Sequence, residues 1–295
     1  MKLFLTVLAL CASLMGVTSQ ASAAAFGSSI MNTSNLRLQY FNGSSWVDAT
    51  SAQATIVDTA VTSRSSATLG GTNFTSGRTT GLNAVQSFVS STSTPPTEQT
   101  SALVGLGQSP TSSFAYGDTW GNNGSTLISA GGIASSTLAE VNALPPLSGT
   151  AFGNINNTSI FEVRVSQGGQ YQLAFTANLS MQAVDGGYAT NSFGVGVSQS
   201  QIGGTVSLPT DNAAWNASLA SLNRSISGSS NWSVSTSFFS PVFTLASWDT
   251  GASDVTFNIT QASTAGTAVV PEPSSMAIFG LMSAGSILAW RRRRV

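Results

Sequence analysis

The sequence predicts an all-β fold, a jelly-roll-like β-sandwich with one or two short helices, placed between an N-terminal signal helix and a C-terminal transmembrane helix. Short runs of Val, Ile, Leu, Phe, Tyr and Trp alternate with Gly, Asn and Ser, which is typical of many short strands. Only 7% of residues are charged, against roughly 25% in ordinary domains. A disordered chain would instead combine low hydrophobicity with high net charge, whereas this one is 41% hydrophobic.

Residues 1–25 have the organisation of a secretory signal peptide. Lys2 precedes an apolar run over 3–17, and small residues follow at 21–25. We expect export through the Sec translocon and a mature chain that begins near Ala24 or Phe26. An uncleaved anchor is less favoured because the run is short, and a lipoprotein is disfavoured because Leu10 precedes Cys11. Removal of the signal also removes the single cysteine, so the mature core forms without disulfides.

Residues 26–269 are expected to form one extracellular β-rich body. Its first half includes a stretch rich in Ser and Thr, 62–101, which is consistent with a flexible or glycosylated stalk. The same stretch contains six large apolar residues, Leu69, Phe74, Leu82, Val85, Phe88 and Val89, which favour strands. Both interpretations stay open at this point.

The clearest strands lie in the second half of the body. Residues 160–165 and 171–179 flank Gly168-Gly169, and this spacing predicts an antiparallel hairpin. Period-two alternation in the second strand directs one set of side chains to the core, namely Tyr171, Leu173, Phe175, Ala177 and Leu179. Further strands are expected at 192–197, 232–239, 242–246 and 255–259, with an edge or bend at Pro241.

Two segments have helical spacing. Asp211 or Asn212 can cap a helix whose apolar residues recur three or four positions apart, at Trp215, Leu219, Leu222 and Ile226. Residues 135–144 are a shorter candidate that ends before Pro145-Pro146. We expect the first helix to cover the core of the sandwich, and an interaction helix is the less favoured alternative.

Composition excludes several kinds of chemistry. The absence of histidine excludes histidine-dependent acid–base and nucleophilic catalysis and imidazole metal ligands. The pI near 5.2 argues against a nucleic-acid partner. Carboxylates are the main proton-transfer groups left, and they have no recognisable catalytic spacing, so we expect no enzyme activity, no cofactor and no metal. Two loops contain the carboxylate and amide oxygens that calcium prefers, namely 249–254 and Asp118 with Asn122-Asn123. Turn formation explains these residues equally well.

A carbohydrate contact is the most concrete molecular alternative. Tyr116, Asp118, Trp120 and Asn122 combine two aromatic rings with a carboxylate and an amide within seven residues. Rings can pack on a sugar while polar groups bond its hydroxyls, although aromatic residues more often fill a core. Trp46, Trp232 and Trp248 are further rings, and we expect them in core strands. A carboxylate-dependent glycoside hydrolase is the less favoured alternative.

The C-terminal residues 270–295 have three parts in a fixed order. Val270, Pro271, Glu272 and Pro273 begin an extended segment, an uncharged run follows to Trp290, and Arg291, Arg292, Arg293 and Arg294 come last. Seventeen residues from Ser274 span about 25 Å as a helix, which is just enough to cross a bilayer. The arginines stop transfer and hold this end in the cytoplasm.

This end resembles the PEP-CTERM sorting signal of exported proteins from Gram-negative bacteria that make extracellular polysaccharide. The resemblance implies that a membrane-embedded exosortase recognises the Pro-Glu-Pro segment and removes the apolar, arginine-rich tail. It implies a transient inner-membrane anchor followed by location at the cell surface or in the extracellular matrix, as in biofilms. We therefore expect an exported non-enzymatic surface or matrix protein, and alternatively an exopolysaccharide-binding module. A permanent one-span anchor, with the prolines only as a linker, is less favoured because the three parts occur in the complete order of the motif.

Overall fold

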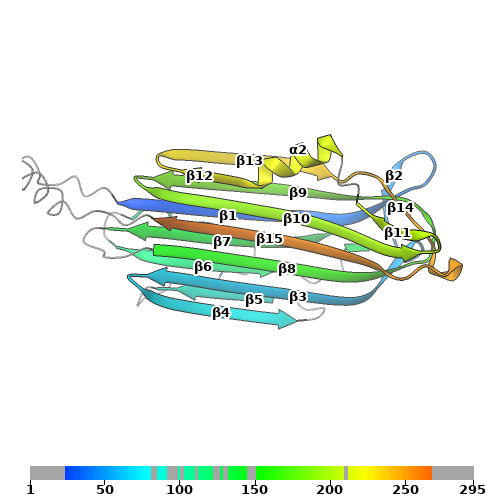
Figure 1. Cartoon of the computed structure of the whole chain (residues 1–295), viewed down its shortest axis with the longest axis horizontal. Helices are drawn as coiled ribbons and strands as arrows, with labels where there is room; N and C mark the ends of the chain where they lie inside the picture. The colour runs from blue at the N-terminus through cyan, green and yellow to red at the C-terminus, as the bar shows by residue number, and fades with distance from the viewer. Residues whose placement is uncertain are drawn as a thin grey trace, which may run out of the picture.

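The computed structural model describes residues 24–80, 85–91, 99, 103–109, 112–121, 127–128, 132–144, 151–208 and 212–267. Two antiparallel sheets pack face to face (Figure 1). Sheet A has the order β13 (Ser230–Phe239), β9 (Gly169–Val184), β1 (Ala25–Phe41), β7 (Ile133–Ala143), β6 (Phe114–Gly121) and β5 (Val85–Ser90), with β14 (Phe243–Leu245) on β9 and β2 (Trp46–Asp48) on β1. Sheet B has the order β11 (Gly204–Ser207), β10 (Gly187–Gln201), β15 (Val255–Thr267), β8 (Ala151–Val165), β3 (Ala54–Leu69) and β4 (Thr72–Thr80), with β12 (Arg224–Ser227) on β10.

The all-β prediction and the two-sheet architecture are confirmed, while the finer jelly-roll wiring stays a prediction. Within the described residues, no helix is long and apolar enough to cross a membrane. The expected signal helix and the expected C-terminal transmembrane helix lie outside those residues, apart from Ala24 and Ala25 at the end of the signal.

The main core lies between the sheets and is filled from both. All five residues predicted to face the core from β9 are buried in it. Phe175 stacks on Phe238 of β13, with ring centroids 5.1 Å apart, and meets Phe193 of β10 across the sandwich at 4.9 Å. Ring pairs at this spacing add to the free energy of burial, so this contact joins both sheets near their β9–β10 side.

A buried polar seam also joins the sheets. Gln261 of β15 donates to the carbonyl of Met31 in β1 (2.6 Å) and accepts from the hydroxyl of Ser135 in β7 (2.8 Å). Ser263 donates to Asn191 Oδ1 (2.9 Å), and Asn191 in turn donates to the carbonyl of Leu222 (2.9 Å). Because each of these buried groups has a partner, the seam helps to fix the alignment of the two sheets.

The predicted hairpin around Gly168-Gly169 is wrong in its pairing, although both strands exist. β8 pairs with β3 and β15 in sheet B, whereas β9 pairs with β1, β13 and β14 in sheet A. The glycine turn therefore carries the chain from one sheet to the other. A tight turn fits either connection, so local sequence does not distinguish them.

The predicted helix at 135–144 is also wrong, because these residues lie almost entirely in β7. Eleven consecutive residues of this strand are buried or nearly so, since its inner face meets sheet B and its outer face is covered. A strand buried on both faces loses its alternation, and Leu138 and Val141 then imitate helical spacing.

The other helix is confirmed with a shorter span. α2 (Ala213–Leu222) begins after Asn212, whose side chain accepts from the amide of Trp215 at 2.8 Å. Trp215 and Leu222 are buried, as an amphipathic core-covering helix requires. Ile226 is not part of it and instead packs on the core from β12.

The Ser/Thr-rich stretch contributes three strands, β3, β4 and β5, so its described residues are not a stalk. Trp46 and Trp232 lie in strands as expected and are half-buried. The prediction that Trp248 lies in a core strand is wrong. Trp248 begins the short 3-10 helix η2 (Trp248–Thr250) and is 51% exposed. The guanidinium carbon of Arg164 lies 5.5 Å from its ring centroid.

Candidate functional site

The predicted sorting residues, Val270 to Pro273 and the four arginines, lie outside the described residues. The structure does show where the body leads into them. β15 ends at Thr267, beside the first residues of β10, and β1 begins at Ala25 at the same end of the sandwich (Figure 1). Three residues lie between Thr267 and Pro271, so the Cα atoms of these two residues are at most about 14 Å apart in a fully extended chain. A processing enzyme must therefore act close to this end of the body.

Glycines allow the sheets to approach closely at that end. A side chain at Gly187 would overlap the carbonyl oxygen of Phe26 in β1, and one at Gly27 would overlap the carbonyl oxygen of Tyr188. Gly266 leaves room for the ring of Tyr188 in the same way. The end of the body that precedes the sorting segment is thus closed by backbone contacts between β1, β10 and β15.

The described residues that were predicted to contact carbohydrate are buried or half-buried. Tyr116 and Asp118 of β6 are fully buried, and Trp120 is half-buried against an apolar cluster on the outer face of sheet A. Tyr116 donates to Asp118 Oδ2 at 3.3 Å, and burial, followed by the Asp118 charge, raises the pKa of its phenol. A ligand in solvent does not reach Tyr116 or Asp118 in this structure. Asn122 lies outside the described residues.

A strap, residues 103–109, covers this outer face of sheet A across β1 and β7. The Leu103 amide donates to Asn32 Oδ1 (3.1 Å), and Asn32 Nδ2 donates back to the Leu103 carbonyl (3.2 Å). At its other end, Asn142 Nδ2 donates to the carbonyl of Ser109 at 2.9 Å. Leu103 itself is buried among Phe26, Phe114 and other members of the apolar cluster. Side-chain amides from two strands therefore hold the strap on the sheet.

Glu140 of β7 holds the middle of the strap. Its Oε1 accepts from the amides of Leu106 (2.8 Å) and Gly107 (3.0 Å), and its Oε2 contacts the hydroxyl of Ser28 at 3.2 Å. Burial raises the pKa of Glu140 to about 7, because desolvation of the charge outweighs these hydrogen bonds. Gly105 lacks the side chain that would overlap the carboxylate. The geometry indicates a structural carboxyl group.

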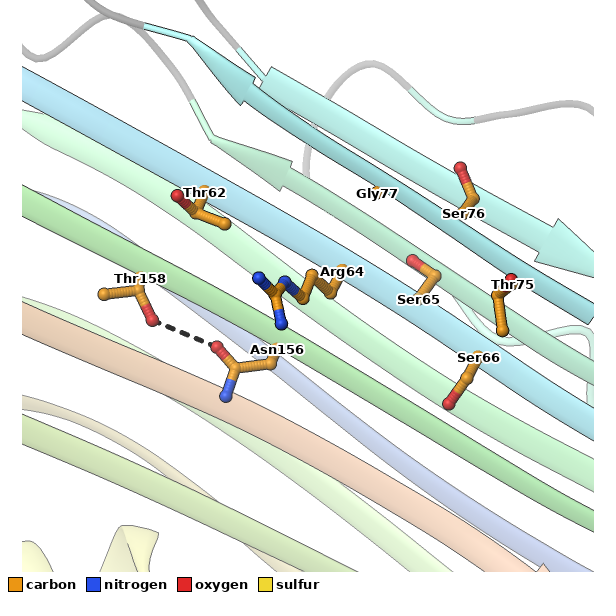
Figure 2. A pocket seen from close by; sticks show the side chains of 9 residues that line it. All are labelled: Thr62, Arg64, Ser65, Ser66, Thr75, Ser76, Gly77, Asn156 and Thr158. Carbon is orange, nitrogen blue, oxygen red and sulfur yellow. Dashed lines mark hydrogen bonds between the residues drawn. The ribbon is translucent and has the colours of Figure 1, made fainter.

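The open candidate site is a polar groove on the outer face of sheet B (Figure 2). It has a volume of about 760 Å³ and runs along β3 between β4 and β8. Hydroxyl, amide and guanidinium groups line it, from Thr62, Arg64, Ser66, Thr75, Ser76, Asn156 and Thr158, with Gly77 opposite Arg64 in the register of β3 and β4. Ser65 also borders the groove, but it is buried and its hydroxyl donates to the carbonyl of Ser87 at 2.7 Å. The lining includes no carboxylate and no aromatic ring.

Two nitrogen donor groups of this groove have no protein acceptor among the described residues. Arg64 is exposed and forms no ion pair there, in contrast to Arg37 and Arg164, which pair with Asp48 and Asp254. Asn156 accepts from Thr158 through Oδ1 (3.1 Å), which leaves its Nδ2 to donate elsewhere. The groove therefore offers N–H donors without a described protein acceptor beside a positive charge.

Sequence reasoning missed this groove. Thr62, Arg64 and Ser66 alternate along β3 and face the same side, but the intervening residues are also small or polar, so the alternation is weak. Distance from acids along the sequence does not single out Arg64, because Arg37 and Arg224 lie farther from any acid. The groove becomes visible only once β8 brings Asn156 opposite Arg64.

The acids of the described part of the chain show no metal-binding group. In the loop at 249–254, the two carboxylate oxygens of Asp254 accept hydrogen bonds from Arg164 Nε and Nη2, each at 3.0 Å. Asp118 accepts from the amide of Gln99 at 3.0 Å as well as from Tyr116. Hydrogen bonds within the protein therefore engage both oxygens of Asp254 and Oδ2 of Asp118.

Comparison with known proteins gives one match. The family model of the PEP-CTERM protein-sorting motif matches residues 269–294, which include every residue predicted for sorting. No curated protein and no solved structure matches the chain. The motif indicates exosortase-dependent sorting of an exported protein to the cell surface. The chain therefore carries, after its two-sheet body, a C-terminal segment that matches the PEP-CTERM protein-sorting motif.

Proposed function

We propose that this chain is a non-enzymatic protein of the cell surface or extracellular matrix of a Gram-negative bacterium. It enters through the Sec translocon, is held briefly in the inner membrane by its C-terminal helix, and is released or re-anchored by exosortase. The observation that carries this proposal is the sorting motif at 269–294 behind a body with no histidine. Hydrogen bonds and burial that occupy Asp118, Glu140 and Asp254 support a non-catalytic role for these acids.

Mapping of the C-terminus tests the sorting step. Mass spectrometry of protein recovered from the cell surface or medium is expected to find chains that end near the Pro-Glu-Pro segment. A variant with Pro271→Ala and Pro273→Ala is expected to keep its tail and stay with the inner membrane. The matched control is Pro241→Ala, a proline of the body. Surface material that still carries Arg294 would contradict exosortase processing.

Carbohydrate binding is the second candidate function, and the groove on sheet B is the observation that favours it. Its hydroxyl and amide lining suits the hydroxyls of a sugar, and its open position along β3 suits a chain rather than an enclosed small molecule. A glycoside hydrolase is less favoured there, because the lining contains none of the paired carboxyl groups that such hydrolysis uses.

A further inference from the structure

We propose that the groove on sheet B binds an anionic polysaccharide, with Arg64 and Asn156 forming the subsite for its carboxylate or sulfate group. This inference rests on the carbohydrate-binding candidate above and adds the ligand's charge and its contact residues. It starts from the two donor groups that Figure 2 shows side by side on neighbouring strands.

The donor geometry favours an oxyanion. Arg64 carries five N–H donors in a planar fork, and Asn156 Nδ2 adds two more from the paired position of β8. Asn156 Oδ1 already accepts from Thr158, whereas no described residue accepts from its Nδ2. Charge-assisted hydrogen bonds to a carboxylate are roughly twice as strong as neutral ones. A group with several acceptors and a negative charge therefore fits these two residues best.

The surroundings leave this positive charge uncompensated. The described acids on this face of β3 and β8 are Asp58 and Glu162, which pair in register with each other, six residues from Arg64 and Asn156 and so about 20 Å along the strands. Gly77, in the register position opposite Arg64, adds no side chain over the guanidinium. The body as a whole is acidic, with five arginines and ten acids between residues 26 and 269. Electrostatic attraction of an anionic ligand is thus local to the groove around Arg64, and added salt is expected to weaken it.

The absence of aromatic rings from the lining argues against a neutral sugar. Neutral hydrogen bonds exchange one partner for water and contribute little net free energy. Without a ring to cover the apolar face of a sugar, a neutral chain gains little in this groove. Hydroxyls from β4 on one side and β8 on the other can instead bond the sugar hydroxyls next to an anchored acid group.

Affinity electrophoresis of the mature protein recovered from producing cells tests the proposal, with polygalacturonate, dextran sulfate and neutral dextran as probes. We expect retardation by polygalacturonate or dextran sulfate, with the preferred acid group identified by the stronger effect, and none by dextran. Arg64→Gln is expected to weaken binding about tenfold, and Asn156→Ala about threefold. Arg64→Lys keeps the positive charge but loses the planar guanidinium. Its binding affinity is expected to lie between those of the unsubstituted protein and Arg64→Gln.

The matched control is Arg164→Gln, which removes the same charge from the same face of sheet B at a distant position and is expected to change binding less than about twofold. Equal effects of both arginine substitutions would overturn the subsite in favour of a diffuse charge effect. Binding of dextran that ignores Arg64 would overturn the anionic ligand while supporting a saccharide site. Binding of none of the probes would overturn both, and the mapped C-terminus would still decide exosortase sorting independently.

Discussion

The outer face of sheet A across β1 and β7 is covered by the strap, whereas the outer face of sheet B across β3 and β8 is open. The covered face presents polar side chains whose partners are backbone groups of the strap, such as Glu140 with Leu106 and Gly107. The open face presents Arg64 and Asn156 with donors that no described residue accepts. Similar polar residues therefore have different roles, depending on whether the chain returns over them.

This difference separates stability from recognition. On the covered face, an acid or amide replaces water as the partner of a strap backbone group in a part-buried hydrogen bond, so its loss removes a contact that holds the strap. On the open face, solvent satisfies the same kind of group, so its loss costs little folding free energy. Paired substitutions on the two faces test this directly.

Glu140→Ala is expected to have the largest effect. It leaves the Leu106 and Gly107 amides without an acceptor and creates a cavity, which together should lower the free energy of unfolding by about 3–5 kcal/mol. Urea unfolding measures the loss, and hydrogen exchange at these amides locates it. The control is Glu162→Ala on the open face, where the expected change is within about 0.5 kcal/mol. Equal effects of both substitutions would contradict a supporting role for Glu140.

The pH dependence of stability is expected to carry a signature of Glu140. Its pKa is about 7 in the folded protein and near 4.5 when exposed, so the folded state holds a proton that the unfolded state releases between these values. The free energy of unfolding should therefore fall as the pH rises from 4.5 to 7, by on the order of 3 kcal/mol from this group.

Glu140→Gln isolates that contribution. The amide oxygen can still accept from Leu106 and Gly107, while the side chain no longer titrates. Subtracting its urea-unfolding curve from that of the unsubstituted protein at each pH should leave the predicted fall. A difference that is flat across this interval would refute the raised pKa.

The strap also explains what sequence reasoning could and could not predict about the fold. β9 alternates clearly because one face meets the core and the other remains partly polar, and its core residues were predicted correctly. β7 was misread as a helix because the strap buries its second face and removes the alternation. Which strands pair across Gly168-Gly169 depends on contacts far apart in sequence, so no local pattern specifies it.

The two functional regions differ in the same way. The sorting signal is a continuous segment, and its residue order alone identified it before the family model matched 269–294. The groove is assembled from β3, β4 and β8, and its two donor residues lie 92 positions apart. The absence of histidine from the sequence could exclude certain kinds of catalysis, but it could not bring Arg64 and Asn156 together.

The smallest expected effects come from a pair of asparagines, one on each face. Asn32→Ala removes two hydrogen bonds to the Leu103 backbone beneath the strap and should lower the free energy of unfolding by about 1–2 kcal/mol. Asn156→Ala removes a side chain on the open face that contacts only Thr158 among the hydrogen bonds described, and it should change that free energy by less than about 0.5 kcal/mol. Urea unfolding of both variants under one buffer gives the comparison. If Asn156→Ala proved as destabilising as Asn32→Ala, its amide would be holding the fold, and the separation between a covered face that stabilises and an open face that binds would fail at this residue.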